Sequence, residues 1–166
     1  YLPKITWKLD GNEGRKITQE KIKTIQNDYL DSWYVKQIAY KTNTKAGIDD
    51  YFTKNARKNI YNIIEYNKLN KISFESTTLR HTLDIEFFSE DGQFIVLKDT
   101  NVLQYKKVFK ADTLLLESSE VSSYRVILLL EDGFWRIRHM VKEASKKFKP
   151  NIKNTFISTI DIKGIN

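Results

Sequence analysis

The chain has 166 residues and a mass of 19.6 kDa, and 40% of its residues are hydrophobic and 13% aromatic. This is enough apolar material for one domain with its own core. Cysteine is absent, which excludes disulfide-stabilised scaffolds and zinc sites built on thiolates. No apolar run approaches the roughly 20 residues of a membrane-spanning helix. Because the chain begins at Tyr1 without an intact signal peptide, we expect it to be a fragment or a mature piece.

The net charge of +7 and the pI of about 9.4 could indicate a nucleic-acid partner. Residues 1–70 contain 13 basic and 8 acidic side chains, residues 71–141 contain 9 and 11, and residues 142–166 contain 6 and 2. No predicted element therefore carries a dense basic stripe. The lysines at positions 142, 146, 147 and 149 have little aromatic interleaving, so we expect a solvated helix end or linker there and no nucleic-acid partner.

The first part of the chain is expected to be helical. Residues 1–15 show no helical period and are interpreted as an entry arm. Thr18 is a predicted helix cap, and apolar residues then recur at three- and four-residue steps as far as Ile38. This pattern predicts a long amphipathic helix over 18–41. A short helix over 48–52 and a further helix over 56–69 are also expected.

From Lys71 the period changes to 2, which is typical of a sheet. The expected strands are 79–87, 93–97 with a resumption at 102–109 after a polar loop at 98–101, 121–130, and 134–142. Asp91-Gly92 and Asp132-Gly133 mark the hairpin turns. Helices followed by two long hairpins predict an α+β fold, with the helices packed in the concave face of a curved antiparallel sheet.

The turn Glu131-Asp132-Gly133, followed by Phe134-Trp135-Arg136-Ile137-Arg138-His139, resembles the ending of the nuclear-transport-factor-two-like superfamily. We assign residues 16–145 to such a domain. The resemblance implies a cone-shaped α+β fold whose sheet curls around the long helix and leaves a pocket. It also implies, for many members, a homodimer through the outer sheet face. Members include dehydratases, isomerases, adaptors and inert accessory modules, so the fold alone does not determine the function.

The last residues carry a second resemblance. Ile160-Asp161-Ile162-Lys163-Gly164-Ile165-Asn166 resembles the opening strand of the catalytic barrel in cellulase-clan glycoside hydrolases. Residues 146–166 are therefore interpreted as a basic linker and the first strand of a following domain; an edge strand or disordered end of the same domain is the alternative. The resemblance implies an exported or membrane-tethered bacterial protein, with the glycoside-cleaving acids beyond Asn166.

Two histidines, His81 and His139, fall on the predicted apolar faces of their strands. If both point into a pocket, a neutral imidazole there could act as an acid or base. The alternative is a core histidine with a satisfied hydrogen bond. Two histidines on separate strands lack a third ligand, so neither a metal nor another cofactor is expected.

A carboxylate in an apolar pocket could abstract a proton, as isomerases do. If no bulge intervenes, Asp99 shares strand parity with Tyr105, which makes them the best pair of this kind; a turn-capping role for Asp99 is the alternative. Tyr29, Trp33 and Trp135 could line a pocket or form the core. No nucleotide fingerprint or serine elbow is present.

These observations favour a non-catalytic accessory domain of a larger glycoside hydrolase-like protein, acting as a spacer, a docking surface or a small-ligand module. A free-standing pocket enzyme of the dehydratase or isomerase type, using His81 or Asp99, is the first alternative. A dimerisation adaptor that uses the outer sheet face is the second.

Overall fold

The computed structural model describes residues 2–9 and 17–148. Helices come first and strands later, apart from one short strand at the start, so the α+β expectation is confirmed. None of the described helices is long and apolar enough to cross a membrane. In chain order the elements are β1 (Lys4–Lys8), α1 (Gln19–Thr42), α2 (Ile48–Tyr51), α3 (Lys54–Leu69), β2 (Ile72–Phe88), β3 (Phe94–Lys110), β4 (Thr113–Glu131) and β5 (Phe134–Phe148).

The five strands form one sheet in the order β1-β2-β3-β4-β5. Strands β2 to β5 are an antiparallel meander, whereas β1 runs parallel to β2, with Ile5 opposite His81. The sheet is therefore mixed, and the expectation of a purely antiparallel sheet with a strandless entry arm is wrong. Local alternation over five residues cannot reveal a partner that lies about 75 positions further along the chain.

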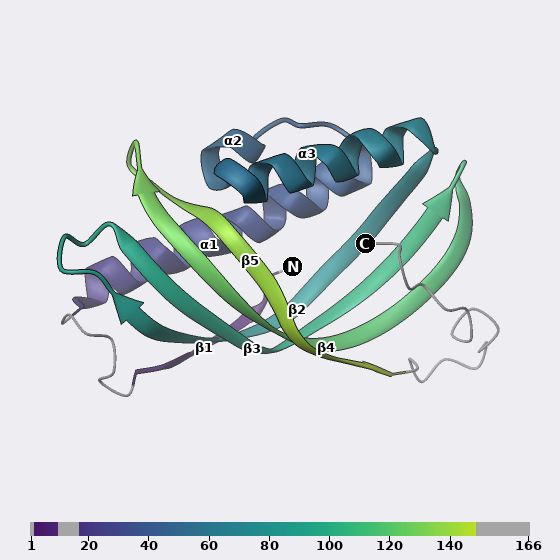
Figure 1. Ribbon diagram of the computed structural model, residues 1–166. Coiled ribbons are helices and arrows are strands. Elements are labelled where there is room, and N and C mark those ends of the chain that lie inside the picture. Colours follow the sequence, from purple (N-terminus) through teal and green to yellow (C-terminus); the bar gives the residue numbers. More distant parts are fainter. Residues whose placement is uncertain (1, 10–16, 149–166) are drawn as a thin grey trace.

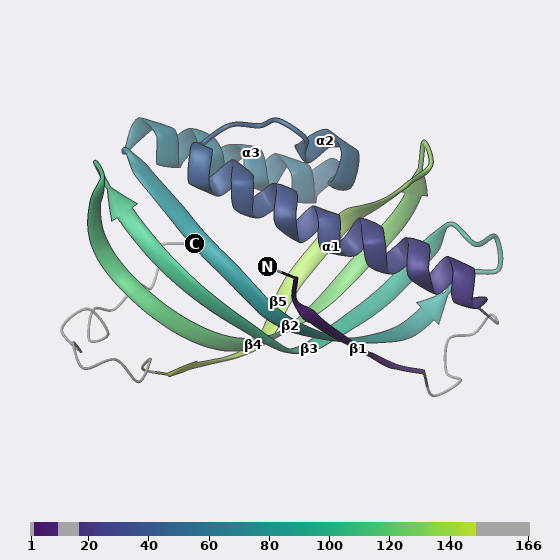
Figure 2. The same cartoon turned by 180° about the vertical axis from the view of Figure 1, so that it is seen from behind.

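The helices lie together on the concave side of this curved sheet (Figure 1). Seen from behind, α1 runs across the sheet from one end to the other (Figure 2). The predicted helix over 18–41 is confirmed to within one residue: the Thr18 side chain accepts a hydrogen bond from the backbone N–H of Lys21 at 3.2 Å, and Asn43 ends the helix in the left-handed region. The buried stripe is narrower than predicted, because Tyr34 is 64% exposed.

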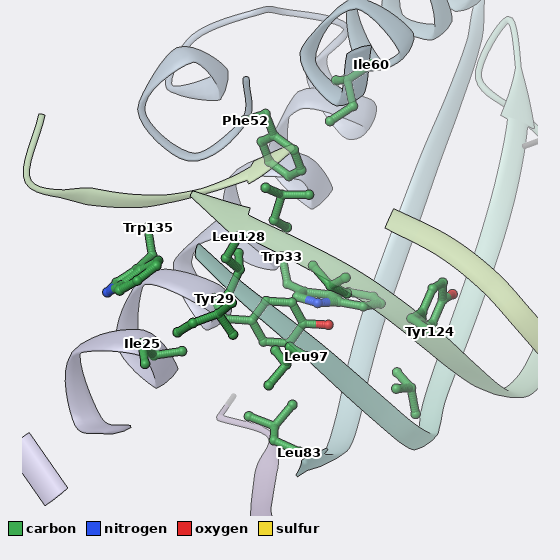
Figure 3. Packing of buried hydrophobic residues seen from close by; sticks show 14 of the residues in the cluster. Ile25, Tyr29, Trp33, Phe52, Ile60, Leu83, Leu97, Tyr124, Leu128 and Trp135 are labelled. Atoms are coloured by element: carbon green, nitrogen blue, oxygen red, sulfur yellow. The ribbon is translucent and has the colours of Figure 1, made fainter. Parts of the chain in front are cut away.

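The core fills the space between α1, α2, α3 and the concave side of the sheet (Figure 3). Tyr29 and Trp33 from α1 lie at its centre, and Leu83, Leu97 and Leu128 reach it from three successive strands. These side chains are almost fully buried. Because Trp33 lies in this core, the residues of α1 that are three or four positions away from it lie on the helix face toward the sheet.

Strand β3 is continuous, so the predicted loop at 98–101 is wrong. Instead a bulge lies between Asp99 and Val102 in the pairing with β4, and Asn101 adopts a positive φ of 54° within it. The polar residues of this stretch remain in the ladder, where Asp99 pairs with Leu83 on one side and Tyr124 on the other. Strand β4 also begins earlier than predicted, at Thr113.

Candidate functional site

Four of the seven predicted pocket residues meet in a buried network. Tyr29 Oη donates a hydrogen bond to Asp99 Oδ2 at 2.8 Å, and His81 Nδ1 lies 2.6 Å from the same oxygen. The backbone N–H of Thr82 donates to Asp99 Oδ1 at 3.1 Å. Trp33 lies edge-on to His81, with ring centroids 5.0 Å apart. Tyr29, Trp33, His81 and Asp99, each named separately as a candidate pocket residue, thus lie together in the core.

The network is sealed from solvent. The side chains of His81 and Asp99 are both 0% exposed, and burial together with the Asp99 charge raises the pKa of Tyr29 well above its ordinary value. A hollow of about 260 Å³ beneath Leu2 and Pro3 borders Trp33 and His81. His81 Nε2 is itself buried and has no hydrogen-bond partner among the described residues, so this ring nitrogen does not reach solvent.

The pairing of Asp99 with Tyr105 is wrong. The bulge after Asp99 reverses the alternation of β3, so that Val102 is buried while Tyr105 is 42% exposed. The prediction assumed an uninterrupted strand. Asp99 instead takes Tyr29 as its hydroxyl donor, from a helix that lies 70 positions earlier in the chain.

Trp135 and His139 also lie apart from the network. Trp135 is buried in the core, where its ring centroid lies 6.4 Å from that of Phe88, and its backbone N–H donates to Asp28 Oδ2 at 2.9 Å. A bulge in β5 after Ile137 then shifts the alternation, so Met140 packs against the core and His139 is exposed. The expectation that His139 shares the face of Trp135 and Ile137 is therefore wrong.

A second site lies further along α1, between α1 and α3 and the inner side of β2 to β5. Two adjoining hollows of about 340 and 400 Å³ share their lining at Lys36, Tyr40, Ile63, Tyr124 and Lys142. We name them together the lysine pocket. The smaller hollow is also lined by Trp33, Gln37, Phe74, Ser76, Gln104 and Lys106.

Each of the three lysines of this pocket stands over an aromatic ring. The Nζ–centroid distances are 4.8 Å for Lys36 over Trp33, 5.6 Å for Lys106 over Phe74, and 6.0 Å for Lys142 over Tyr124. These distances are typical of cation–π contacts, and such contacts hold the ammonium groups against the apolar wall.

Only one of the three lysines has an acidic partner within the described residues. Lys142 Nζ lies 2.6 Å from Glu120 Oε1, whereas the polar contact of Lys36 is the sulfur of Met140, at 4.0 Å. Burial, reinforced by the charges of Lys106 and Lys142, lowers the pKa of Lys36 to about 8. Burial and the charge of Lys142 likewise lower the pKa of Lys106. The pocket therefore holds an excess of positive charge, with Lys36 and Lys106 half-buried and the side chain of Lys142 32% exposed.

Neutral hydrogen-bonding groups complete the lining. Gln104 Nε2 donates to the Tyr124 hydroxyl at 2.8 Å, and Gln37 Nε2 donates to Thr78 Oγ1 at 2.8 Å. Both amides are thus held in place by a neighbouring hydroxyl. Among the described residues no group of three histidine, aspartate or glutamate side chains could hold a metal ion.

The sequence reasoning missed the lysine pocket. Its lysines come from three elements and lie up to 106 positions apart. Lys142 was expected both as the last residue of the strand 134–142 and as the first of a solvated group of lysines; it belongs to β5 and lines the pocket. One signal was present: Lys36 follows Trp33 by three residues and precedes Tyr40 by four, so a charged residue occupies the apolar face of α1. Lys106 could not be found this way, because the bulge sets its direction.

No protein-family model matches the sequence, and no curated protein matches it. In structure the chain is similar to the intermembrane space region of the chloroplast protein ARC6, with a TM-score of 0.64. The alignment covers 77% of this chain and 98% of the ARC6 region, at 10% sequence identity. At this identity the likeness shows an α+β fold and carries no function from one protein to the other.

Proposed function

We propose that this chain is a non-catalytic domain that binds a small ligand in the lysine pocket. The observation that carries the proposal is the lining of that pocket: aromatic walls, three lysines and two fixed amides that surround hollows of about 340 and 400 Å³. Small-molecule sites are typically apolar clefts of roughly this size, with a few placed polar groups that orient the ligand.

The buried network supports a binding role over catalysis. Asp99 already accepts hydrogen bonds from Tyr29 and Thr82 and contacts His81, so its oxygens are occupied. A dehydratase or isomerase would need one of these groups exposed to a substrate. The same contacts explain how the Asp99 carboxylate is accommodated in the core, since Tyr29, Thr82 and His81 Nδ1 surround its oxygens.

We infer that the domain is a nuclear-transport-factor-two-like cone, which the helices on the concave side of the sheet support. The resemblance of Lys163-Gly164-Ile165-Asn166 to a glycoside hydrolase strand supports a catalytic neighbour in the same bacterial protein and an extracytoplasmic location; this tail lies outside the described residues. A homodimer through the outer sheet face would bury the charged contacts of Arg125 with Glu86 and Glu143.

Binding can be tested with two fluorescent probes that share one anilinonaphthalene skeleton, neutral N-phenyl-1-naphthylamine and anionic 8-anilinonaphthalene-1-sulfonate. We expect saturable binding of at least one of them. The Ser76→Phe variant should abolish it, because Ser76 lines the pocket, whereas Thr77→Phe adds the same bulk on the exposed side of the strand. The proposal fails if neither probe binds saturably, if both variants bind alike, or if the chain turns over a glycoside or a small carbonyl compound.

A further inference from the structure

The lysine pocket holds more positive than negative charge, and this excess indicates which class of ligand it binds. Three ammonium groups face it, and among the described residues one carboxylate, that of Glu120, balances them. Glu120 lies against Lys142 and also accepts a hydrogen bond from Ser122, so it is engaged at one side of the pocket. Lys36 and Lys106 line the same hollow, where the charges of Lys106 and Lys142 repel the Lys36 ammonium group, while the charge of Glu120 offsets part of the repulsion on Lys106.

Such an arrangement is costly in the empty protein. Lys36 and Lys106 are half-buried, and an ammonium group without an acidic partner loses part of its hydration there and gains little in return. The rings of Trp33 and Phe74 recover part of the loss through cation–π contacts. An anion placed between the two lysines would recover more, because it would end their repulsion and form charge-assisted hydrogen bonds.

The other side chains that line the pocket indicate what the uncharged part of the ligand is like. Trp33, Tyr40, Phe74 and Tyr124 supply flat aromatic surface, and Ile63 adds an aliphatic contact from α3. Flat apolar walls favour a flat or compact apolar body over a heavily hydroxylated sugar, which would need a denser set of donors and acceptors. The hollows of about 340 and 400 Å³ suit a small molecule better than a polymer.

We infer that the lysine pocket binds a small organic anion with an apolar, ring-sized body, whose charged group lies between Lys36 and Lys106. This inference rests on the proposed binding function and adds the chemical class of the ligand. Lys36, Lys106 and the amide of Gln104 are the groups that would select the charge, and the aromatic walls would hold the body.

The two probes named above differ in the sulfonate group alone. Their comparison therefore tests the preference for an anion separately from the ability of the pocket to bind a small ligand. We expect the anionic probe to bind at least 10-fold more tightly than the neutral one. Lys36→Met should remove most of this preference while leaving the affinity for the neutral probe within about 2-fold. The Lys36→Met, Lys106→Met double variant should abolish the preference entirely.

Lys41→Met is the matched control. Lys41 lies on the same helix, but its side chain is 58% exposed and faces Glu75 at 4.0 Å. It should leave both affinities unchanged. Equal binding of the two probes, or an equal loss in Lys41→Met and Lys36→Met, would overturn the assignment of an anion while leaving the binding function intact. Absence of binding by both probes would instead overturn the binding function itself.

Discussion

Replacement of Lys36 by methionine should stabilise the protein while it weakens anion binding. Methionine keeps the length and most of the volume of the lysine stem, so the core around Trp33 is not opened. The pKa of Lys36 falls from 10.5 to about 8 on folding. At about 1.4 kcal/mol per pKa unit, this corresponds to about 3 kcal/mol by which the charged form disfavours the native state.

Methionine also loses the cation–π contact with Trp33, which contributes about 1 kcal/mol. The net gain expected for Lys36→Met is therefore about 1–3 kcal/mol in the free energy of unfolding at pH 7. Denaturant titrations, followed by circular dichroism, measure it directly. Lys41→Met again serves as control, and it should change the free energy of unfolding by less than about 0.5 kcal/mol.

The gain in stability of Lys36→Met over the wild type should decrease as the pH rises. Below pH 8 Lys36 is charged in both states and the full penalty applies. Between about pH 8 and 10.5 the unfolded wild-type chain binds more protons than the native protein, so the wild-type free energy of unfolding rises with pH. The difference in free energy of unfolding between Lys36→Met and the wild type therefore decreases over this range. The charged or titratable groups that line the two hollows with Lys36 are Lys106, Lys142, Tyr40, Tyr124 and His139, and Glu120 lies against Lys142; all are present in both proteins.

A loss of stability in Lys36→Met at pH 7, or a gap that stays constant between pH 7 and 10, would refute this reasoning. Either result would mean that the ammonium group is well solvated or paired in the native protein.

Three further substitutions test the fold around the site. Asp99→Ala should cost about 3–5 kcal/mol in the free energy of unfolding, because it leaves the hydroxyl of Tyr29 and the imidazole of His81 buried without their acceptor; a cost below 1 kcal/mol would contradict the network. Asn101→Gly should be neutral or stabilising and Asn101→Val should cost about 1–3 kcal/mol, since φ is positive there; equal thermal unfolding of the two would argue against the bulge. Thr18→Ala should cost about 1 kcal/mol by chemical denaturation, and no loss would mean that α1 does not depend on this cap.

The helices and the hairpins could be predicted from the sequence because their signals are local. Thr18 and the three- and four-residue spacing from Ile22 to Ile38 need no knowledge of partners, and Asp132-Gly133 marks a turn by backbone chemistry alone. The parallel pairing of β1 is different, because it depends on a strand far along the chain.

The candidate site was predicted less well, and the bulges explain most of the difference. One extra residue after Asp99 turns Tyr105 outward and Lys106 inward, and one after Ile137 does the same to His139 and Lys142. Simple alternation assigns all four side chains to the wrong face. Tyr29, Trp33 and His81 lie before these bulges; each was named separately as a candidate pocket residue, and the structure brings them together with Asp99.

The most direct test of ligand binding in the lysine pocket uses the three indole N–H groups of the chain as reporters in a nuclear magnetic resonance titration. Trp33 lines the pocket, whereas Trp7 donates its indole N–H to Gln26 at 2.7 Å and Trp135 packs against Phe88. With 1-naphthoate as the anion, and signals assigned by single Trp→Phe variants, we expect the Trp33 signal to shift saturably while the other two stay in place. A Trp33 signal that does not move at millimolar 1-naphthoate, or three signals that move alike, would contradict the account.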